Sequence, residues 1–108
     1  MQTKKFRKTF SERVVELAKS IPKGRVTTYG DLARACGAGP MASQSITNIL
    51  WKAEQKGARD IPYHRIVYAN GKIWVDDDCR ARRMRLYKKE RIKIDEKDRI
   101  VGFEEIRI

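Results

Sequence analysis

Proline and glycine interrupt the first half of the chain at short intervals, so no element there can be long. Residues 9–12, Thr-Phe-Ser-Glu, have the spacing of a capping box, in which the threonine caps a helix and the glutamate reaches back to it. Apolar residues then recur at helical spacing to about Ser20. Residues 21–24, Ile-Pro-Lys-Gly, end this predicted helix.

Two further short helices are predicted after that interruption. Residues 28–31, Thr-Tyr-Gly-Asp, favour a helix start with Asp31 in the weaker capping position, and Gly37 suits a C-terminal cap. Pro40 fits the first turn of a third helix that runs to about Gln55. Two helices joined by a short glycine-containing turn form a helix-turn-helix. The third helix carries small polar side chains that can approach a groove and bond phosphates or base edges, namely Ser43, Gln44, Ser45, Thr47 and Asn48.

The periodicity changes after residue 65, from that of helices to that of strands. Residues 66–69 and 72–75 flank Asn70-Gly71, the strongest short signal for a β-hairpin, and a hairpin after a helix-turn-helix is a wing. The aspartates of residues 76–78 favour the start of a last helix, which carries eight basic residues in the segment 80–93. Short strands or loop are expected near Ile100 and Phe103. The fold class predicted is mainly α with a small β-hairpin, a winged helix-turn-helix DNA-binding domain.

The charge balance favours a polyanionic partner. The chain has 25 Lys and Arg against 14 Asp and Glu, a net charge of +11, and nucleic acid is the commonest polyanion. A merely very soluble or thermophile-like surface is the alternative that charge alone leaves open. A length of 108 residues suits a single domain over 1–108. No apolar run could span a bilayer and no signal-peptide pattern opens residues 1–8, so an intracellular protein is expected, in the cytoplasm, nucleoid or nucleus.

The cysteines do not have metal-ligand spacing. Cys36 and Cys79 lie far apart in the sequence, and His64 is the one histidine, so a zinc site would need unusual ligands. Two free thiols in a reducing compartment are expected, with no metal and no cofactor.

Residues 62–67, Pro-Tyr-His-Arg-Ile-Val, resemble the Pro-Cys-His-Arg-Val motif of the O6-alkylguanine-DNA alkyltransferases, with Tyr63 in the cysteine position. Residues 21–33 are similar to that family's segment entering the helix-turn-helix. Gly71 and Glu90 have the separation seen between the family's hairpin glycine and network glutamate. The resemblance covers about residues 9–92, the family's C-terminal DNA-binding domain.

In that family the cysteine thiolate takes the alkyl group from a flipped-out base, activated by histidine through a water and by glutamate. The resemblance therefore implies a degenerate site of Tyr63, His64 and Glu90 that transfers no alkyl group, because a phenol is a far poorer acceptor than a thiolate. Alkyltransferase-like proteins, which are similar, bind O6-alkylguanine in DNA and hand it to nucleotide excision repair. A non-enzymatic protein that recognises O6-alkylguanine by base flipping, in the minor groove, and flags it for repair is the function implied.

Three departures from the family pattern keep other functions open. The position of the family's groove-filling arginine falls on Gln44, the lesion loop reads Trp-Val-Asp-Asp-Asp over 74–78, and residues 54–59 replace a short turn. An architectural or regulatory DNA protein without lesion recognition is one alternative. An active alkyltransferase that uses Cys79 or Cys36 is another.

The predicted site residues fall into three groups. The degenerate catalytic positions are Tyr63, His64 and Glu90, and the lesion pocket is formed by Tyr63, Trp74 and Val75. The DNA-contacting residues are Thr28, Tyr29, Ser43, Gln44, Ser45, Thr47, Asn48, Arg65 and Arg83.

Duplex DNA and nucleotide excision repair proteins are the expected partners, and a monomer is the expected state.

Overall fold

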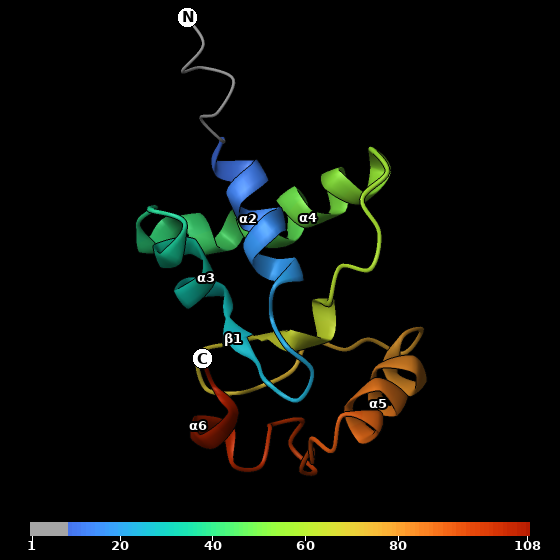
Figure 1. Cartoon of the computed structure of the whole chain (residues 1–108). Coiled ribbons are helices and arrows are strands. Elements are labelled where there is room, and N and C mark those ends of the chain that lie inside the picture. The colour runs from blue at the N-terminus through green and yellow to red at the C-terminus, as the bar shows by residue number, and fades with distance from the viewer. Residues whose placement is uncertain (1–8) are drawn as a thin grey trace, which may run out of the picture.

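The computed structural model describes residues 9–108, and the basic segment 1–8, where no signal peptide is expected, lies outside the described residues. Figure 1 shows a helical upper half joined to a lower half by two short strands. The prediction of a mainly helical fold is confirmed. The elements in chain order are α2 (Phe10–Lys19), β1 (Thr27–Thr28), α3 (Tyr29–Ala35), η1 (Pro40–Ser45), α4 (Ile46–Gln55), η2 (Tyr63–Arg65), β2 (Ile66–Val67), α5 (Arg80–Lys89) and α6 (Phe103–Ile106).

The capping box at the start of α2 is confirmed. The Thr9 hydroxyl accepts a hydrogen bond from the Glu12 N–H at 3.1 Å, and the Glu12 carboxylate accepts one from the Thr9 N–H at 2.9 Å. These two bonds satisfy N–H groups that the first turn of a helix leaves unpaired. The helix then buries Val14 and Ala18 against the core.

The second predicted helix is also confirmed, as α3. Thr28 is its N-cap, because the Thr28 hydroxyl accepts from the Asp31 N–H at 3.0 Å. The Asp31 carboxylate instead holds Arg107 from the C-terminal end, at 2.8 Å. Gly37 has φ +87° just after the helix, and the next N–H bonds back to Ala33 at 3.0 Å. A left-handed glycine followed by this bond is the C-terminal motif predicted from the sequence.

The third predicted helix divides into two parts. Pro40–Ser45 form the 3₁₀ segment η1, and α-helical geometry begins only at Ile46 in α4. Neither segment has a side-chain hydrogen bond at its N-cap. The tighter 3₁₀ turns of η1 lead directly into α4. Helices α3 and α4, with η1 between them, form the helix-turn-helix.

The predicted hairpin of residues 66–69 and 72–75 is wrong, although its turn is present. Gly71 has φ +82° and its N–H bonds the Tyr68 carbonyl at 2.8 Å. The strand before the turn, Ile66–Val67, pairs in parallel with Thr27–Thr28. Beyond the turn, Lys72 bridges Arg99 instead. The turn signal therefore fixed the bend and one bond across it, from the Tyr68 N–H to the Lys72 carbonyl at 2.9 Å, whereas the strand partner of Ile66–Val67 and the bridge partner of Lys72 come from distant parts of the chain.

Helix α5 is shorter than the predicted helix over 76–93. Asp76 caps the turn that precedes it, accepting from the Cys79 N–H at 2.9 Å. Its end at Lys89 is set by Arg91, which has φ +62°, and the Ile92 N–H then bonds the Tyr87 carbonyl at 2.9 Å. The helix itself holds six of the eight basic residues, namely Arg80, Arg82, Arg83, Arg85, Lys88 and Lys89.

The buried side chains form two clusters, one on each side of the strand pair. Ile66 packs with the helix-turn-helix cluster, whereas the next residue, Val67, packs with the second cluster. Successive residues of a strand point to opposite faces, so β2 contributes to both. The tail was expected to be strands or loop; it pairs in part but also forms α6 and adds Ile100 and Phe103 to the second cluster.

Replacing Gly71 with alanine should lower the free energy of unfolding by roughly 2–4 kcal/mol. A side chain at φ +82° is strained, and its Cβ would lie 2.9 Å from Cγ of Phe103. Gly57→Ala is the matched control, because Gly57 also has positive φ but no atom lies within 4 Å of the added Cβ. Chemical denaturation should give a loss of roughly 1–2 kcal/mol for the control. Equal losses would contradict a close packing of Phe103 on the turn.

Candidate nucleic-acid interface

Glu90, the C-cap of α5, is the centre of a charged hydrogen-bond network. Its carboxylate accepts from His64 Nε2 at 2.6 Å, from Arg65 Nη2 at 2.8 Å and from the Gly24 N–H at 2.9 Å. Burial alone would favour the neutral acid, but the hydrogen bonds of Arg65, Gly24 and His64 lower the pKa of Glu90 to about 2. The network therefore ties η2, α5 and the loop after α2 together around a fixed negative charge.

His64 is buried and neutral in this network. Burial lowers the pKa of His64 despite the adjacent Glu90 carboxylate. The ring therefore donates its Nε2 proton to Glu90. On the other side, the Tyr87 hydroxyl donates to the His64 carbonyl at 2.6 Å. Both bonds hold the backbone that carries Tyr63.

Arg65 and Thr28 were predicted to contact DNA, and the structure gives each a different role. The Arg65 side chain is 14% exposed, with Nε and Nη2 on Glu90 and Nη1 on the Ile21 carbonyl at 2.8 Å. Thr28 is 2% exposed and caps α3. Neither side chain has the exposure that a phosphate contact needs, so neither belongs to the candidate interface.

Tyr63 begins η2 and carries an unsatisfied hydroxyl. Its ring packs against the helix-turn-helix cluster, and its hydroxyl oxygen is buried near the Glu54 carboxylate, without a hydrogen bond of good geometry to any described residue. Burial raises the pKa of Tyr63, and the nearby Glu54 carboxylate raises it further. The phenol is therefore neutral at physiological pH, and its hydroxyl is left with hydrogen-bonding capacity.

Arg83 is the cation that the aromatic side chains of the site share. Its guanidinium lies 5.5 Å from the centre of the Trp74 ring, and Nη1 donates to the Trp74 carbonyl at 3.2 Å. The same charge acts on Tyr29 and Tyr63, lowering the pKa of each against the larger effect of burial. Trp74 is 42% exposed, whereas Val75 packs against the second cluster. Arg83 and Trp74 thus stay in the candidate site, and Val75 lies on its core side.

The polar face predicted on the third helix is divided between two surfaces. Gln44, Ser45 and Thr47 are exposed, and Ser43 is half-buried. Thr47 interacts with the phenol of Tyr29, whose ring lies 5.5 Å from that of Tyr68. Asn48, although exposed, lines a groove of about 730 Å³ between α2 and α4. The contacts predicted for Ser43, Gln44, Ser45, Thr47 and Asn48 with DNA stay predictions.

Three residues of this region were missed in the sequence reasoning. Trp51 and Tyr68 are exposed aromatic side chains at 54% and 43%, and Glu54 lies beside Tyr63. Trp51 and Glu54 follow Thr47 by four and seven positions in a predicted helix, so the helical repeat could have placed them on its face. Tyr68 gave no comparable signal, because its contact with Tyr29 depends on the parallel strand pair.

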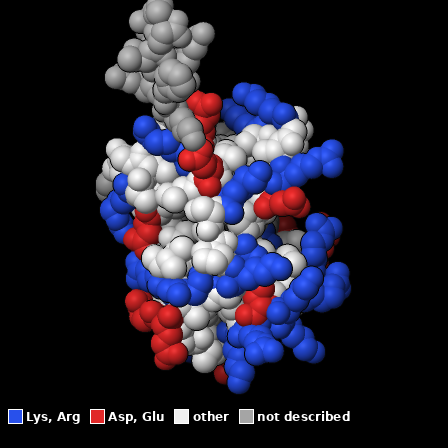
Figure 2. All heavy atoms as spheres, in the orientation of Figure 1, with Lys and Arg blue, Asp and Glu red and all other residues white. Residues whose placement is uncertain are grey.

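Basic side chains gather over α5, at the lower right of Figure 2. Arg82, Arg85, Lys88 and Lys89 are exposed there. In the loop of residues 76–78, the Asp76 carboxylate accepts a hydrogen bond from the Cys79 N–H. The exposed Asp77 and Asp78 are therefore the carboxylates of this loop that face solvent. The interface therefore combines an aromatic centre, a polar helix and a basic flank.

The cysteines occupy different environments. Cys36 is 3% exposed in the core, and burial raises the pKa of its thiol. Cys79 is the N-cap of α5, and its sulfur accepts from the Asp76 N–H at 3.4 Å. Within residues 9–108, no three metal-ligating side chains come together, and no helix there has the length and apolar character to cross a membrane.

Comparison with known proteins gives a consistent set of relatives. The family described as 6-O-methylguanine DNA methyltransferase, DNA binding domain, matches residues 9–92. A protein of Escherichia coli K12 named DNA base-flipping protein is 35% identical over 65 residues, which cover 60% of this chain and 48% of that protein. The Shigella flexneri protein of the same name matches equally. The chain thus spans about half the length of these curated relatives.

Solved structures share the fold. Atl1 of S. pombe, in complex with damaged DNA containing O6-carboxymethylguanine, superposes with a TM-score of 0.69 at 22% identity, over 92% of this chain and 94% of that one. The O6-methylguanine methyltransferase of Mycobacterium tuberculosis gives a TM-score of 0.57 at 27% identity, over 78% of this chain and 50% of that one. The predicted winged helix-turn-helix architecture is confirmed by this likeness, with a parallel strand pair in place of the hairpin. With its match over residues 9–92, the chain belongs to the family of the 6-O-methylguanine DNA methyltransferase DNA-binding domain.

Proposed function

We propose that this protein binds duplex DNA in the minor groove and recognises O6-alkylguanine by rotating the base out of the helix, without transferring its alkyl group. The observation that carries this proposal is that position 63, directly before His64, holds the neutral phenol of Tyr63, while the hydrogen bond between His64 and Glu90 is present. The names of the bacterial relatives, and the damaged DNA bound by the structurally similar Atl1, support the same function.

Tyr63 cannot replace a thiolate as the alkyl acceptor. Burial raises the pKa of its hydroxyl, so the nucleophilic phenolate is scarce at neutral pH. His64 donates Nε2–H to Glu90 and so keeps Nδ1 as a free base, but the group at position 63 that a base would activate is a phenol and not a thiol. Cys36 is enclosed in the core, and Cys79 caps α5 outside the network. The geometry therefore favours recognition over reaction.

The same residues suit a base that has left its stack. A flat ring would find Trp74, exposed and backed by the Arg83 guanidinium, whereas the buried Tyr63 hydroxyl would be reached only once its ring moves. The exposed cations of α5 would hold the flanking phosphates. In this proposal the bound protein marks the lesion, and nucleotide excision repair proteins take it over from a monomeric complex.

A second candidate function is DNA binding without lesion recognition, in an architectural or regulatory role. The feature that favours it is the pair of exposed carboxylates, Asp77 and Asp78, in the loop that would approach the lesion. Gln44 also favours this second function, because it cannot supply the charge or stacking plane of an arginine.

Binding to a duplex with one O6-methylguanine should be at least about tenfold tighter than binding to the same duplex with guanine. Fluorescence anisotropy with labelled duplexes measures both affinities. Equal affinities would establish the second candidate instead. Mass spectrometry of the protein after incubation should show no adduct, since a stable gain of about 14 Da on Cys79 or Cys36 would demonstrate alkyl transfer.

A further inference from the structure

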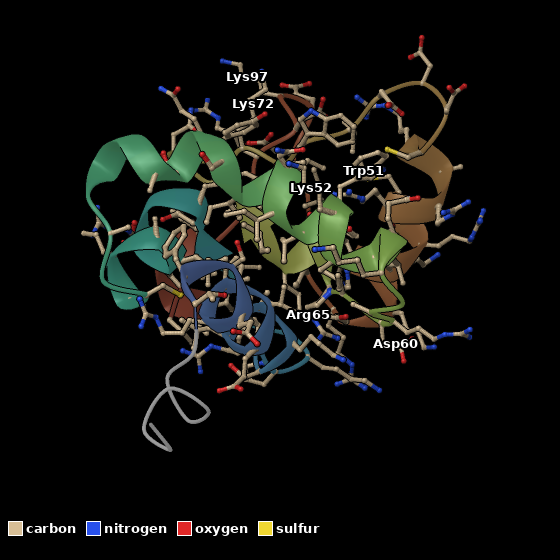
Figure 3. All side chains as sticks on the ribbon, turned by 90° about the horizontal axis from the view of Figure 1, so that it is seen from above. Trp51, Lys52, Asp60, Arg65, Lys72 and Lys97 are labelled. Carbon is tan, nitrogen blue, oxygen red and sulfur yellow. The ribbon has the colours of Figure 1, made fainter. Side chains whose placement is uncertain are left out.

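Trp51 is an exposed tryptophan that neither the network nor the predicted lesion pocket uses. It lies on α4 next to Leu50, which is fully buried, yet 54% of its own surface is exposed. In Figure 3, Trp51 lies on the side of α4 that faces α5. Single exposed apolar side chains are common, so it is the place of Trp51 in the candidate site, rather than its exposure alone, that calls for a partner.

The helical repeat places Trp51 at the candidate site. Thr47, Trp51 and Glu54 are separated by four and three residues, so they share one face of α4. Thr47 interacts with Tyr29, and Glu54 lies beside the Tyr63 hydroxyl. Trp51, between them on the same face, therefore lies on the side of α4 that carries the contacts with the tyrosines of η2 and α3.

The surroundings of Trp51 select the chemistry of its partner. The chain has a net charge of +11, and Arg82, Arg85 and Lys88 are exposed on α5, the helix that the Trp51 side of α4 faces in Figure 3. An exposed planar ring on a strongly basic protein suits nucleic acid, which offers bases for stacking and phosphates for the cations elsewhere on the surface. A hydrophobic peptide would match the ring but not the charge.

We propose that Trp51 stacks on a nucleobase that has lost its own stacking neighbour in bound DNA. The inference rests on the proposed function, because base flipping is what creates such a base. Two bases fit this description: the one rotated out of the helix, and its former partner left unpaired in the opposite strand. Trp51 stacks equally on either kind of ring, because every base presents a π-face.

The test uses three undamaged duplexes of one sequence, so that it does not depend on lesion recognition. One is fully paired, one carries a single extra unpaired base, and one has an abasic site opposite a normal base. Trp51→Ala should weaken binding to one or both of the imperfect duplexes by roughly 5- to 150-fold and leave the paired duplex nearly unchanged. Loss on the extra-base duplex alone identifies the extruded base, and loss on the abasic duplex alone identifies the orphaned one.

Two further variants separate stacking from other causes. Trp51→Phe keeps a ring and should retain most of the affinity, while Lys52→Ala, which removes a cation lining the α2–α4 groove, should leave the preference unchanged. In a Trp74→Phe protein, Trp51 is the remaining tryptophan, and its fluorescence should fall when the imperfect duplex binds.

The inference is overturned if Trp51→Ala binds all three duplexes like the unmodified protein, or weakens all three equally. Those outcomes are distinct from failure of the proposed function. The proposed function fails when the unmodified protein binds O6-methylguanine and guanine duplexes with equal affinity, whatever the Trp51 variants do.

Discussion

Replacing Glu90 with alanine should lower the free energy of unfolding by roughly 3–5 kcal/mol. The substitution leaves the Arg65 guanidinium, 14% exposed, without the carboxylate that neutralises it. It also removes the acceptor of the His64 Nε2 proton and of the Gly24 N–H. Unpaired buried donors and charges are among the largest costs a single substitution can impose. Urea denaturation monitored by circular dichroism measures the loss.

Glu96→Ala is the matched control, because Glu96 is an exposed glutamate on the tail. It should change the free energy of unfolding by no more than about 0.5 kcal/mol. A Glu90→Ala protein as stable as this control would mean that the network contributes nothing to the fold.

Acid should act on the same network. The folded pKa of Glu90, about 2, lies below its ordinary value of 4.5, so its contribution is complete above pH 4.5 and is lost as the pH falls toward 2. This loss amounts to about 3 kcal/mol. The pKa of His64 is also lowered, from 6.5, so acid weakens the fold there too, beginning at a higher pH. Glu90→Ala should reduce the loss of stability between pH 4.5 and 2 without abolishing it, because the pKa values of Asp31 and Asp98 are also lowered from 3.8.

Local determinants made parts of the fold predictable. The capping box of α2 and the glycine end of α3 each depend on residues within a few positions of one another. The hairpin failed for the opposite reason. Asn70-Gly71 encodes a turn, but the partner of Ile66 is Thr27 and that of Lys72 is Arg99. Pairing between such distant segments depends on how the whole chain packs, which no local sequence pattern predicts.

The site was predictable where the resemblance placed a residue and not where packing decided its role. Tyr63, His64 and Glu90 were named from the motif and its spacing, and the structure brings His64 and Glu90 into contact. Arg65 was predicted to contact DNA. A carboxylate 25 residues away in sequence instead draws its side chain inward. Charge type alone does not report which cations remain free.

Affinity for undamaged duplex DNA should fall roughly 500-fold when salt is raised from 50 to 200 mM. Besides Arg80, which pairs with Asp98, α5 has four exposed cations. With Arg83 they offer about five phosphate contacts, and each contact releases counterions from DNA. Five contacts give a slope of about −4.5 for the logarithm of the association constant against the logarithm of salt concentration. Anisotropy titrations at four or five salt concentrations determine that slope. An affinity independent of salt would exclude the basic flank from the interface.

Single substitutions show which residues make the phosphate contacts that determine this slope. Arg82→Ala and Arg85→Ala should each make the slope shallower by about 1 and weaken binding for every sequence alike, because phosphate contacts carry no sequence information. Lys19→Ala is the matched control, since Lys19 is an exposed cation at the end of α2, in the other half of the molecule. It removes the same charge and should leave the slope unchanged. If all three variants shift the slope equally, net charge rather than a defined α5 surface attracts the DNA, and the candidate interface would have to be placed elsewhere.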